Sequence, residues 1–137
     1  MTTLDETRTV APQLHFAAGI PAFPDARRFE LRPWGDPDGP FSVMQSLEDE
    51  NLAFVVTHPG WFFPDFTIDL DDDTADRLGL RQPTDALVLV IVTVRERAQD
   101  ATANLLGPIV VNRHTNEAMQ VVLHDSRYDV RTPLASS

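Results

Sequence analysis

Eleven prolines divide this 137-residue chain into short segments. They occupy positions 12, 21, 24, 33, 37, 40, 59, 64, 83, 108 and 133. Proline has no backbone N–H and clashes with the preceding turn, so it is disfavoured inside helices and central strands. Few of the gaps between the prolines could hold a long helix. We therefore expect short strands joined by turns.

The segments between the prolines favour strands. The clearest is residues 86–94, Ala-Leu-Val-Leu-Val-Ile-Val-Thr-Val, whose β-branched content favours strand over helix. Because its apolar run is almost unbroken, we expect both of its faces to be covered and place it centrally in the sheet. A hairpin loop is predicted over residues 113–117, which include Asn116. Further strands are predicted over residues 14–16, 28–32, 41–46, 52–57, 65–70, 109–112 and 119–123.

One segment has the signals of a helix. Asp71, Asp72 and Asp73 supply hydrogen-bond acceptors and negative charge at a helix start. Residues 74–78 form the body, and Gly79 is suited to the left-handed conformation that ends many helices. Such a short helix is a connector. Short strands with frequent turn signals then predict a mainly β fold, a barrel or a sandwich, in one domain.

Charge restricts the class of partner. The chain has 11 basic residues, all of them Arg, against 21 acidic residues, which gives a net charge of −10. Nucleic-acid affinity depends on cations that displace counterions, so we expect no direct binding of RNA or DNA. The same negative field would speed association with a basic protein. The alternative is that the acidity only keeps the protein soluble.

The chain lacks the features of secreted and membrane proteins. It has no cysteine, so disulfides and thiolate nucleophiles are excluded. Its first ten residues contain no apolar stretch behind a basic region, as a signal peptide would. The apolar run at 86–94 is far shorter than the roughly 20 residues that a membrane helix needs. We expect a cytoplasmic protein with no membrane partner.

Motifs for catalysis and metal binding are also missing. There is no G-x-S-x-G, P-loop or G-x-G-x-x-G pattern, and the four histidines are widely spaced. The acidic run 69–73 fails as a calcium loop, because Thr74 and Leu80 stand where Gly and Glu are required. We expect no catalytic, cofactor or metal site and no enzymatic activity. The run is interpreted as a solvated helix start or as an acidic patch for a basic partner.

Residues 58–66, His-Pro-Gly-Trp-Phe-Phe-Pro-Asp-Phe, combine four aromatic residues with two prolines. Aromatic side chains are enriched at interface hot spots, and a loop stiffened by proline loses little entropy on binding. This pattern favours an aromatic anchor for a partner. The alternative is that the rings fill the core beneath a loop.

Several segments match the pattern of a known family in order along the chain. Residues 16–23, F-A-A-G-I-P-A-F, are similar to F-x-x-G-L-P-G-F, and residues 40–46, P-F-S-V-M-Q-S, to P-F-x-x-L-Q-S. Residues 54–59, F-V-V-T-H-P, and 102–112, T-A-N-L-L-G-P-I-V-V-N, are similar to F-V-V-x-x-P and T-A-N-L-x-A-P-I-x-I-N. With residues 87–93, 120–123 and 128–133, the chain resembles the FliW family of flagellar assembly factors over about residues 14–134. It departs from the pattern at Ala22, Pro24 and Gly107.

The resemblance implies a fold and partners. It implies a mainly β, single small barrel-like domain of antiparallel strands over residues 14–134, with one short connector helix and no cofactor. Residues 1–13 would be an N-terminal extension or an edge strand. The implied partners are flagellin, bound in the cytoplasm before export, and CsrA, an RNA-binding translational repressor that the family antagonises. When flagellin accumulates it sequesters the factor, CsrA is freed, and flagellin translation falls.

An acidic protein could disarm an RNA-binding protein by placing negative charge near its RNA surface, without touching RNA. Two other functions stay open: flagellin binding without CsrA, and a β-barrel enzyme or small-ligand module whose site these motifs do not reveal.

The predicted partner-binding residues fall in three groups. Phe62, Phe63 and Asp65 form the anchor. Asp71, Asp72 and Asp73 form an electrostatic rim, called the acidic rim below. Asn104 is a predicted polar contact, with a buried amide that satisfies backbone groups as the alternative.

Overall fold

The computed structural model describes residues 12–21, 23–36, 38–94, 100–124 and 128–134. Most of the N-terminal extension expected over residues 1–13 lies outside these ranges, as does Ala22. The strands are β1 (Gln13–Phe16), β2 (Arg28–Pro33), β3 (Phe41–Ser46), β4 (Ala53–Thr57), β5 (Ala86–Thr93), β6 (Thr102–Ala103), β7 (Ile109–Asn112), β8 (Glu117–Gln120) and β9 (Thr132–Pro133). The helix is α2 (Asp72–Leu78), and η1 (Pro59–Trp61) and η2 (Pro83–Asp85) are 3₁₀ turns. In this part of the chain no helix has the length and apolar character needed to cross a membrane.

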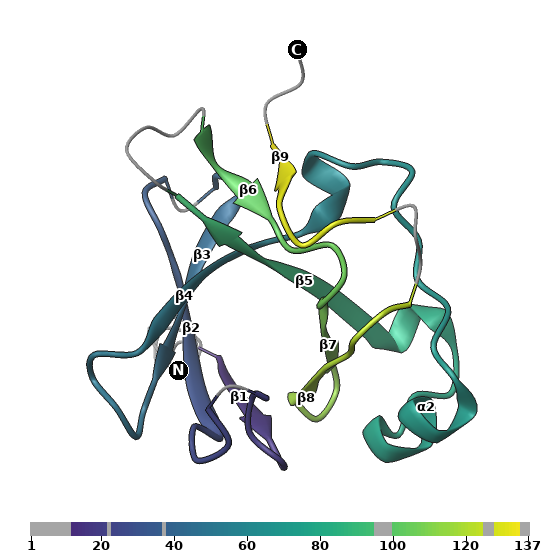
Figure 1. Ribbon diagram of the computed structural model, residues 1–137. Helices are drawn as coiled ribbons and strands as arrows, with labels where there is room; N and C mark the ends of the chain where they lie inside the picture. The colour runs from purple at the N-terminus through teal and green to yellow at the C-terminus, as the bar shows by residue number, and fades with distance from the viewer. Residues whose placement is uncertain (1–11, 22, 37, 95–99, 125–127, 135–137) are drawn as a thin grey trace, which may run out of the picture.

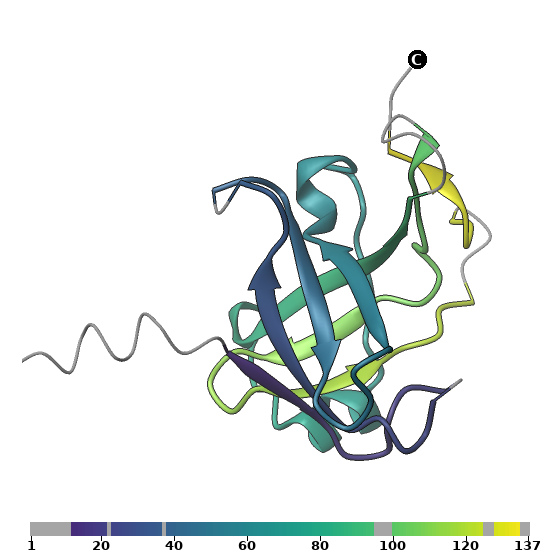
Figure 2. The same ribbon diagram turned by 90° about the vertical axis from the view of Figure 1, so that its left-hand side faces the viewer.

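Seven strands close into a barrel in the order β1-β2-β3-β4-β5-β7-β8 (Figure 1). Figure 2 shows β2, β3 and β4 side by side on one wall. All neighbours in the barrel are antiparallel except β1 and β8, which pair His15 with Glu117 and Phe16 with Ala118 in parallel. In a barrel of alternating strands an odd strand number brings the first and last strands together in the same direction. The predicted barrel is therefore confirmed, with one parallel pair at its closure.

The strand β5 is the junction of the sheet. Its first half pairs with β7, and its second half pairs with β4 on one side and with β6 on the other. The short strand β9 extends the sheet beyond β6. The central position predicted for residues 86–94 is thus confirmed.

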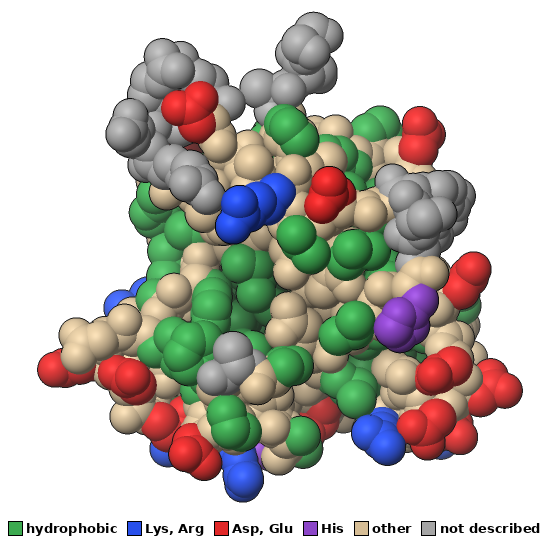
Figure 3. Space-filling model, in the orientation of Figure 1, with side chains coloured by type: hydrophobic (Ala, Val, Ile, Leu, Met, Phe, Trp, Pro, Cys, Tyr) green, Lys and Arg blue, Asp and Glu red, His purple; other side chains and the backbone are tan. Residues whose placement is uncertain are grey.

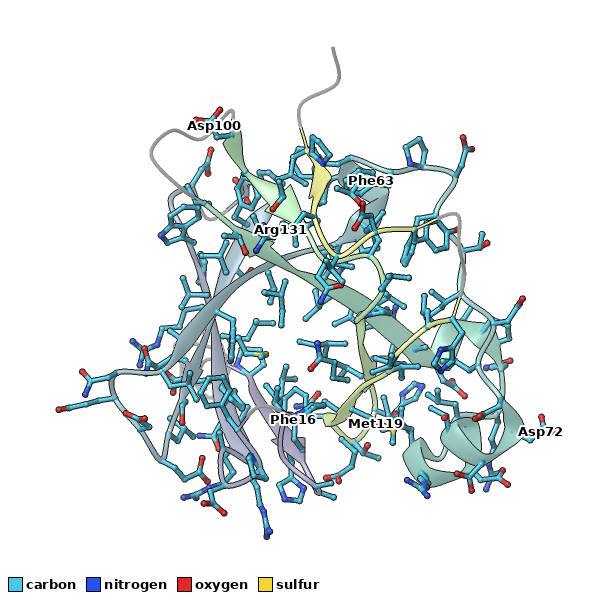
Figure 4. All side chains as sticks on the ribbon, viewed as in Figure 1. Phe16, Phe63, Asp72, Asp100, Met119 and Arg131 are labelled. Atoms are coloured by element: carbon cyan, nitrogen blue, oxygen red, sulfur yellow. The ribbon has the colours of Figure 1, made fainter. Side chains whose placement is uncertain are left out.

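The barrel interior is filled by alternate side chains of its strands, as the two-residue period of a strand requires. Phe16, labelled in Figure 4, is fully buried and meets Phe29 edge to face, with ring centroids 5.4 Å apart. The buried members of this cluster are Leu14, Phe16, Ile20, Ala26, Phe29, Met44, Val56, Leu89, Ile109, Val111 and Ala118.

A second apolar cluster covers the outer face of β5. Val90 and Val92 point out of the barrel and are buried with Ala101, Ala103 and Leu105. Half-buried side chains close over them: Phe41, Val55, Phe63, Phe66, Tyr128 and Leu134. The second half of the strand therefore buries its outer face at Val90 and Val92 as well as packing against the barrel interior, in keeping with its apolar sequence.

The connector helix is confirmed with both of its predicted ends. Asp71 is the N-cap, and its carboxylate accepts a 2.8 Å hydrogen bond from the backbone N–H of Thr74. Gly79 adopts φ +71° at the C-terminal end, a conformation that favours glycine. The buried amide of Asn112 donates to the carbonyl of Leu78 at 2.7 Å, which fastens the end of the helix to the barrel.

Two strand predictions differ from the structure, and two short strands were not predicted. The strand predicted over residues 65–70 is wrong, because this segment pairs with no other strand. The alternation of polar and apolar residues in this segment arises because Ile68 and Leu70 are half-buried, whereas Thr67 and Asp69 are exposed. The strand predicted over 119–123 lies earlier, at Glu117–Gln120. The two-residue strands β6 and β9 were not predicted, since so short a strand has no readable period.

Two turns have clear backbone reasons, and the first of them was predicted. The hairpin loop between β7 and β8 is confirmed, and Asn116 takes φ +64°, which Asn tolerates better than most residues. Gly19, within the segment that matches F-x-x-G-L-P-G-F, has φ +71°, and a Cβ there would collide with the backbone of Pro24.

Candidate protein-binding surface

The predicted aromatic anchor and the acidic rim fall at two separate places on the molecule. Figure 4 places Phe63 near the top of the barrel and Asp72 at the lower right. The chain between η1 and α2 runs down the outside of the barrel and connects them (Figure 1). The structure thus groups Phe62 with Phe63, and separately groups the acidic rim; it does not bring the two groups into one cluster.

The two predicted anchor rings are held by packing. Phe63 is half-buried against the second apolar cluster. Phe62 is half-buried and stacks on Phe41, with centroids 5.7 Å and planes 25° apart. Trp34 in turn meets Phe41 edge to face at 5.8 Å. We call Trp34, Phe41, Phe62 and Phe63 the aromatic row.

The most exposed aromatic residue of the segment 58–66 is Trp61, which is 60% exposed. Trp34, at the far end of the aromatic row, is 43% exposed. Neither tryptophan was predicted as a contact. The position of Trp61 within a Pro-Gly-Trp turn was the available signal, because a tight turn projects side chains away from the core.

The segment below the aromatic row is fixed by the hydroxyl of Tyr128. This hydroxyl accepts from the backbone N–H of Thr67 and donates to its carbonyl, both at 3.2 Å. The ring of Tyr128 also meets Phe66 edge to face at 4.7 Å. Asp65 is exposed just before this anchor point. The loop therefore follows a defined path along the barrel.

The acidic rim is exposed and lies at the start of α2. Hydrogen bonds from the Thr74 side chain and backbone hold the pKa of Asp71 below its ordinary value. Asp73 pairs with Arg77 one helical turn later, at 3.1 Å. In Figure 3 acidic side chains gather over α2 and also over the turn between β3 and β4, so the negative charge is spread over two sides of this face.

Asn104 is engaged with its own turn. Its side-chain oxygen accepts hydrogen bonds from the backbone N–H groups of Leu106 and Gly107, both at 3.0 Å. The side chain is half-buried. This geometry fits the alternative given for Asn104, an amide that satisfies backbone groups.

A groove, called the α2 groove below, lies between the segment before α2, the end of the helix, η2 and β5. Its volume is about 360 Å³. The lining is mainly apolar and comprises Ile68, Leu70, Ala75, Leu80, Pro83 and Val88. Arg81, Gln82 and Ala86 complete it. The groove could not be predicted from the sequence, because its walls come from segments up to twenty residues apart.

Asp85 fixes one wall of the α2 groove. One oxygen of this nearly buried carboxylate accepts from the backbone N–H groups of Arg81 and Gln82, at 3.0 and 3.2 Å. The other oxygen lies 3.0 Å from the Nε2 of His114 on the β7–β8 hairpin. These bonds, first the one from Arg81, hold the pKa of Asp85 below its ordinary value. The charge of Asp85 thus serves to hold the wall of the groove in place.

Among the described residues, no three metal-ligating side chains gather into a metal site.

Comparison with known proteins agrees with this geometry. The family described as "FliW protein" matches residues 2–134. The flagellar assembly factor FliW of Bacillus subtilis (strain 168) is 44% identical over 119 residues, which are 87% of this chain and 82% of the relative. The factor of Bacillus licheniformis is 40% identical over 133 residues, covering 97% and 90% of the two chains. A crystal structure of the flagellar assembly factor FliW superposes with a TM-score of 0.85 at 35% identity, over 91% of this chain and 86% of the other. With its sequence matched almost from end to end and its barrel reproduced in a solved relative, this chain belongs to the FliW family.

Proposed function

We propose that this chain is a cytoplasmic flagellar assembly factor that binds flagellin and antagonises the translational repressor CsrA. Binding of one partner would exclude the other, so that the level of free flagellin sets the level of free CsrA. The observation that carries the proposal is the family match over residues 2–134, together with the shared barrel. The relatives are named for flagellar assembly, and we extend that role to this chain.

The charge of the chain supports the antagonism of an RNA-binding protein. The net charge of −10 opposes RNA binding by the chain itself. A protein that binds RNA must carry cations, and these are attracted to an acidic surface. Once bound, the chain would bring negative charge to the RNA-binding protein and weaken its affinity for RNA. The negative charge is thus proposed to act on the repressor and not on the message.

The contacts proposed for this function follow from the exposure of each side chain. Asp71, Asp72 and Asp73 are exposed carboxylates and serve as the steering surface. Phe62, Phe63 and Asp65 are kept as proposed contacts, although the two rings already pack within the protein. Asn104 is kept as a polar contact through its amide nitrogen, since its oxygen is engaged.

The experiment that tests the proposal uses the purified chain with flagellin and CsrA from the same bacterium. Calorimetry measures each binary affinity, and a gel-shift assay follows a CsrA–RNA complex as the chain is added. We expect saturable binding of the chain to each partner. The CsrA–RNA complex should be lost as the chain is added, and it should return when flagellin is added. The chain alone with RNA serves as the control and should give no shift. A chain that binds neither protein would overturn the proposal.

A further inference from the structure

We infer that the α2 groove is a docking site for a short apolar segment of a protein partner, flanked by lysine or arginine. The inference deepens the proposed function, on which it rests, by naming a surface and the chemistry of its occupant. The predicted contacts Phe62 and Phe63 are not part of this surface.

The floor and walls of the groove are apolar but incompletely covered. Val88 belongs to the outer face of β5, where Val90 and Val92 are buried to 0% and 5% exposure by the aromatic side chains above them. Over Val88 no such cover is present among the described residues, and its side chain is only half-buried. Ile68, Leu70 and Leu80 are also half-buried. When a partner covers apolar surface of this kind, the free energy of the system falls, which favours binding.

The walls of the groove are fixed before any partner arrives. Asp85 holds residues 81 and 82, and Asn112 holds the end of α2 through the Leu78 carbonyl. The Tyr128 hydroxyl holds the other wall at Thr67. A preformed groove binds with a smaller entropy cost than one that must be ordered on binding. At about 360 Å³ its size is at the small end of the range for preformed sites, roughly 300–1,000 Å³, so it admits a few side chains and not a whole surface.

The charges around the groove determine what flanks the apolar segment. Ile68 and Leu70 line the groove, whereas the intervening Asp69 and the following Asp71 are exposed to solvent. Asp72 lies three positions before Ala75 on α2 and thus borders the same face. Five exposed carboxylates and two exposed arginines lie between residues 69 and 82. An acidic border of this kind attracts cations, so the fitting occupant carries lysine or arginine next to its apolar side chains.

The test fills the groove with a side chain of the protein itself. In Ala75→Trp the indole would occupy the groove, and we expect affinity for flagellin, CsrA or both to fall by at least about tenfold, as for the loss of a hot-spot contact. Ala53→Trp is the matched control: Ala53 is an exposed residue at the start of β4, and its substitution should leave both affinities unchanged. Circular dichroism and thermal melting check that each variant is folded. If Ala75→Trp does not fold, Leu70→Ser removes apolar surface that the segment before α2 contributes to the groove, and should weaken binding about fivefold.

The outcomes separate this inference from the proposed function. If the wild-type chain binds its partners and both groove variants bind equally well, the groove is not the docking site and the proposed function stands. If the wild-type chain binds neither protein, the proposed function fails, and a synthetic amphipathic helix of leucine and lysine decides the inference alone. Binding of this peptide that is lost in Ala75→Trp, and is absent for its twin with glutamate in place of lysine, supports the docking site. Equal binding by the wild type and the variant, or no binding at all, overturns it.

Discussion

The outer face of β5 is covered by other side chains in its second half but left open in its first half. Toward its C-terminal half, Val90 and Val92 are buried beneath aromatic side chains that include Phe63 and Phe66. Toward its N-terminal half, Val88 forms part of the open α2 groove with an acidic border. One continuous loop, the chain between β4 and β5, supplies both the aromatic cover and one wall of the groove. The aromatic half of this loop packs against the barrel, whereas the carboxylates of the acidic half are exposed to solvent.

The difference shows why residue type alone is a poor guide to a binding surface. Aromatic residues in a proline-stiffened loop favour a binding hot spot, and here Phe62 and Phe63 also have ring partners in the same molecule. Residues 65–70 are predicted to form a strand, yet Ile68 and Leu70 of this segment line a groove. Whether a side chain is free to meet a partner depends on what it already contacts.

The largest expected effect is on stability in the aromatic half. Phe63→Ala removes half-buried contacts with the second apolar cluster, and we expect the free energy of unfolding to fall by about 2–3 kcal/mol. Trp61→Ala is the matched control, because its ring is 60% exposed, and it should change stability by about 0.5 kcal/mol or less. Urea denaturation of both variants provides the measurement. Equal stability of the two variants would mean that the Phe63 ring contributes nothing to the fold.

A second effect is expected at the attachment of α2. Asn112→Ala leaves the carbonyl of Leu78 and the N–H of His114 without their side-chain partner, and should cost about 2 kcal/mol of stability. It should also lower affinity for any partner that docks in the α2 groove, because one wall loses its attachment. The same urea titration, combined with calorimetry, tests both consequences. Reduced stability with unchanged affinity would show that the groove does not depend on this attachment.

A third effect concerns the acidic rim and is kinetic. Replacing Asp71, Asp72 and Asp73 with Ser keeps an N-cap at position 71 while removing three charges. We expect the association rate with a basic partner to fall about threefold to tenfold at low salt, with a flatter salt dependence. Stopped-flow fluorescence or surface plasmon resonance at several salt concentrations measures this.

The control for the acidic rim removes the same number of charges elsewhere. Asp25, Asp38 and Glu50 are exposed residues outside the α2 region, and their triple Ser variant should retain most of the wild-type rate. If the two triple variants slow association equally, net charge alone is responsible and the rim has no special role. If neither does so at low salt, the acidic rim is not a steering surface.

The smallest expected effect is the pH dependence of the N-cap. The pKa of Asp71 is lowered in the folded protein, so its contribution to stability is fully present above the ordinary pKa of aspartate and is lost as the pH falls through the lowered value. Asp71→Ala should therefore lower the melting temperature slightly at neutral pH. The gap to the wild type should narrow below about pH 4. Asp71→Ser should show a smaller loss at neutral pH, and a gap that is independent of pH would contradict the assigned cap.

Much of the fold could be predicted from local signals. The strands β2, β3, β5 and β7 and the helix α2 have their own periodicity or capping residues, such as Asp71 and Gly79. The closure of the barrel could not be predicted from the sequence, because the parallel pairing of β1 with β8 joins residues about a hundred positions apart. The acidic rim was located, but the groove beside it was not, since Ile68 and Val88 meet only through the fold. Asp85 and His114 are likewise 29 positions apart, and neither stands in a recognisable motif.

Hydrogen–deuterium exchange of the chain with and without flagellin or CsrA tests the central claim most directly. That claim assigns the main partner contact to the acidic half of the β4–β5 loop, whereas the aromatic half mainly stabilises the fold. We predict that a partner will slow exchange most strongly over residues 68–82 and more weakly over residues 59–66. Slowed exchange confined to residues 59–66, with residues 68–82 unaffected, would contradict it.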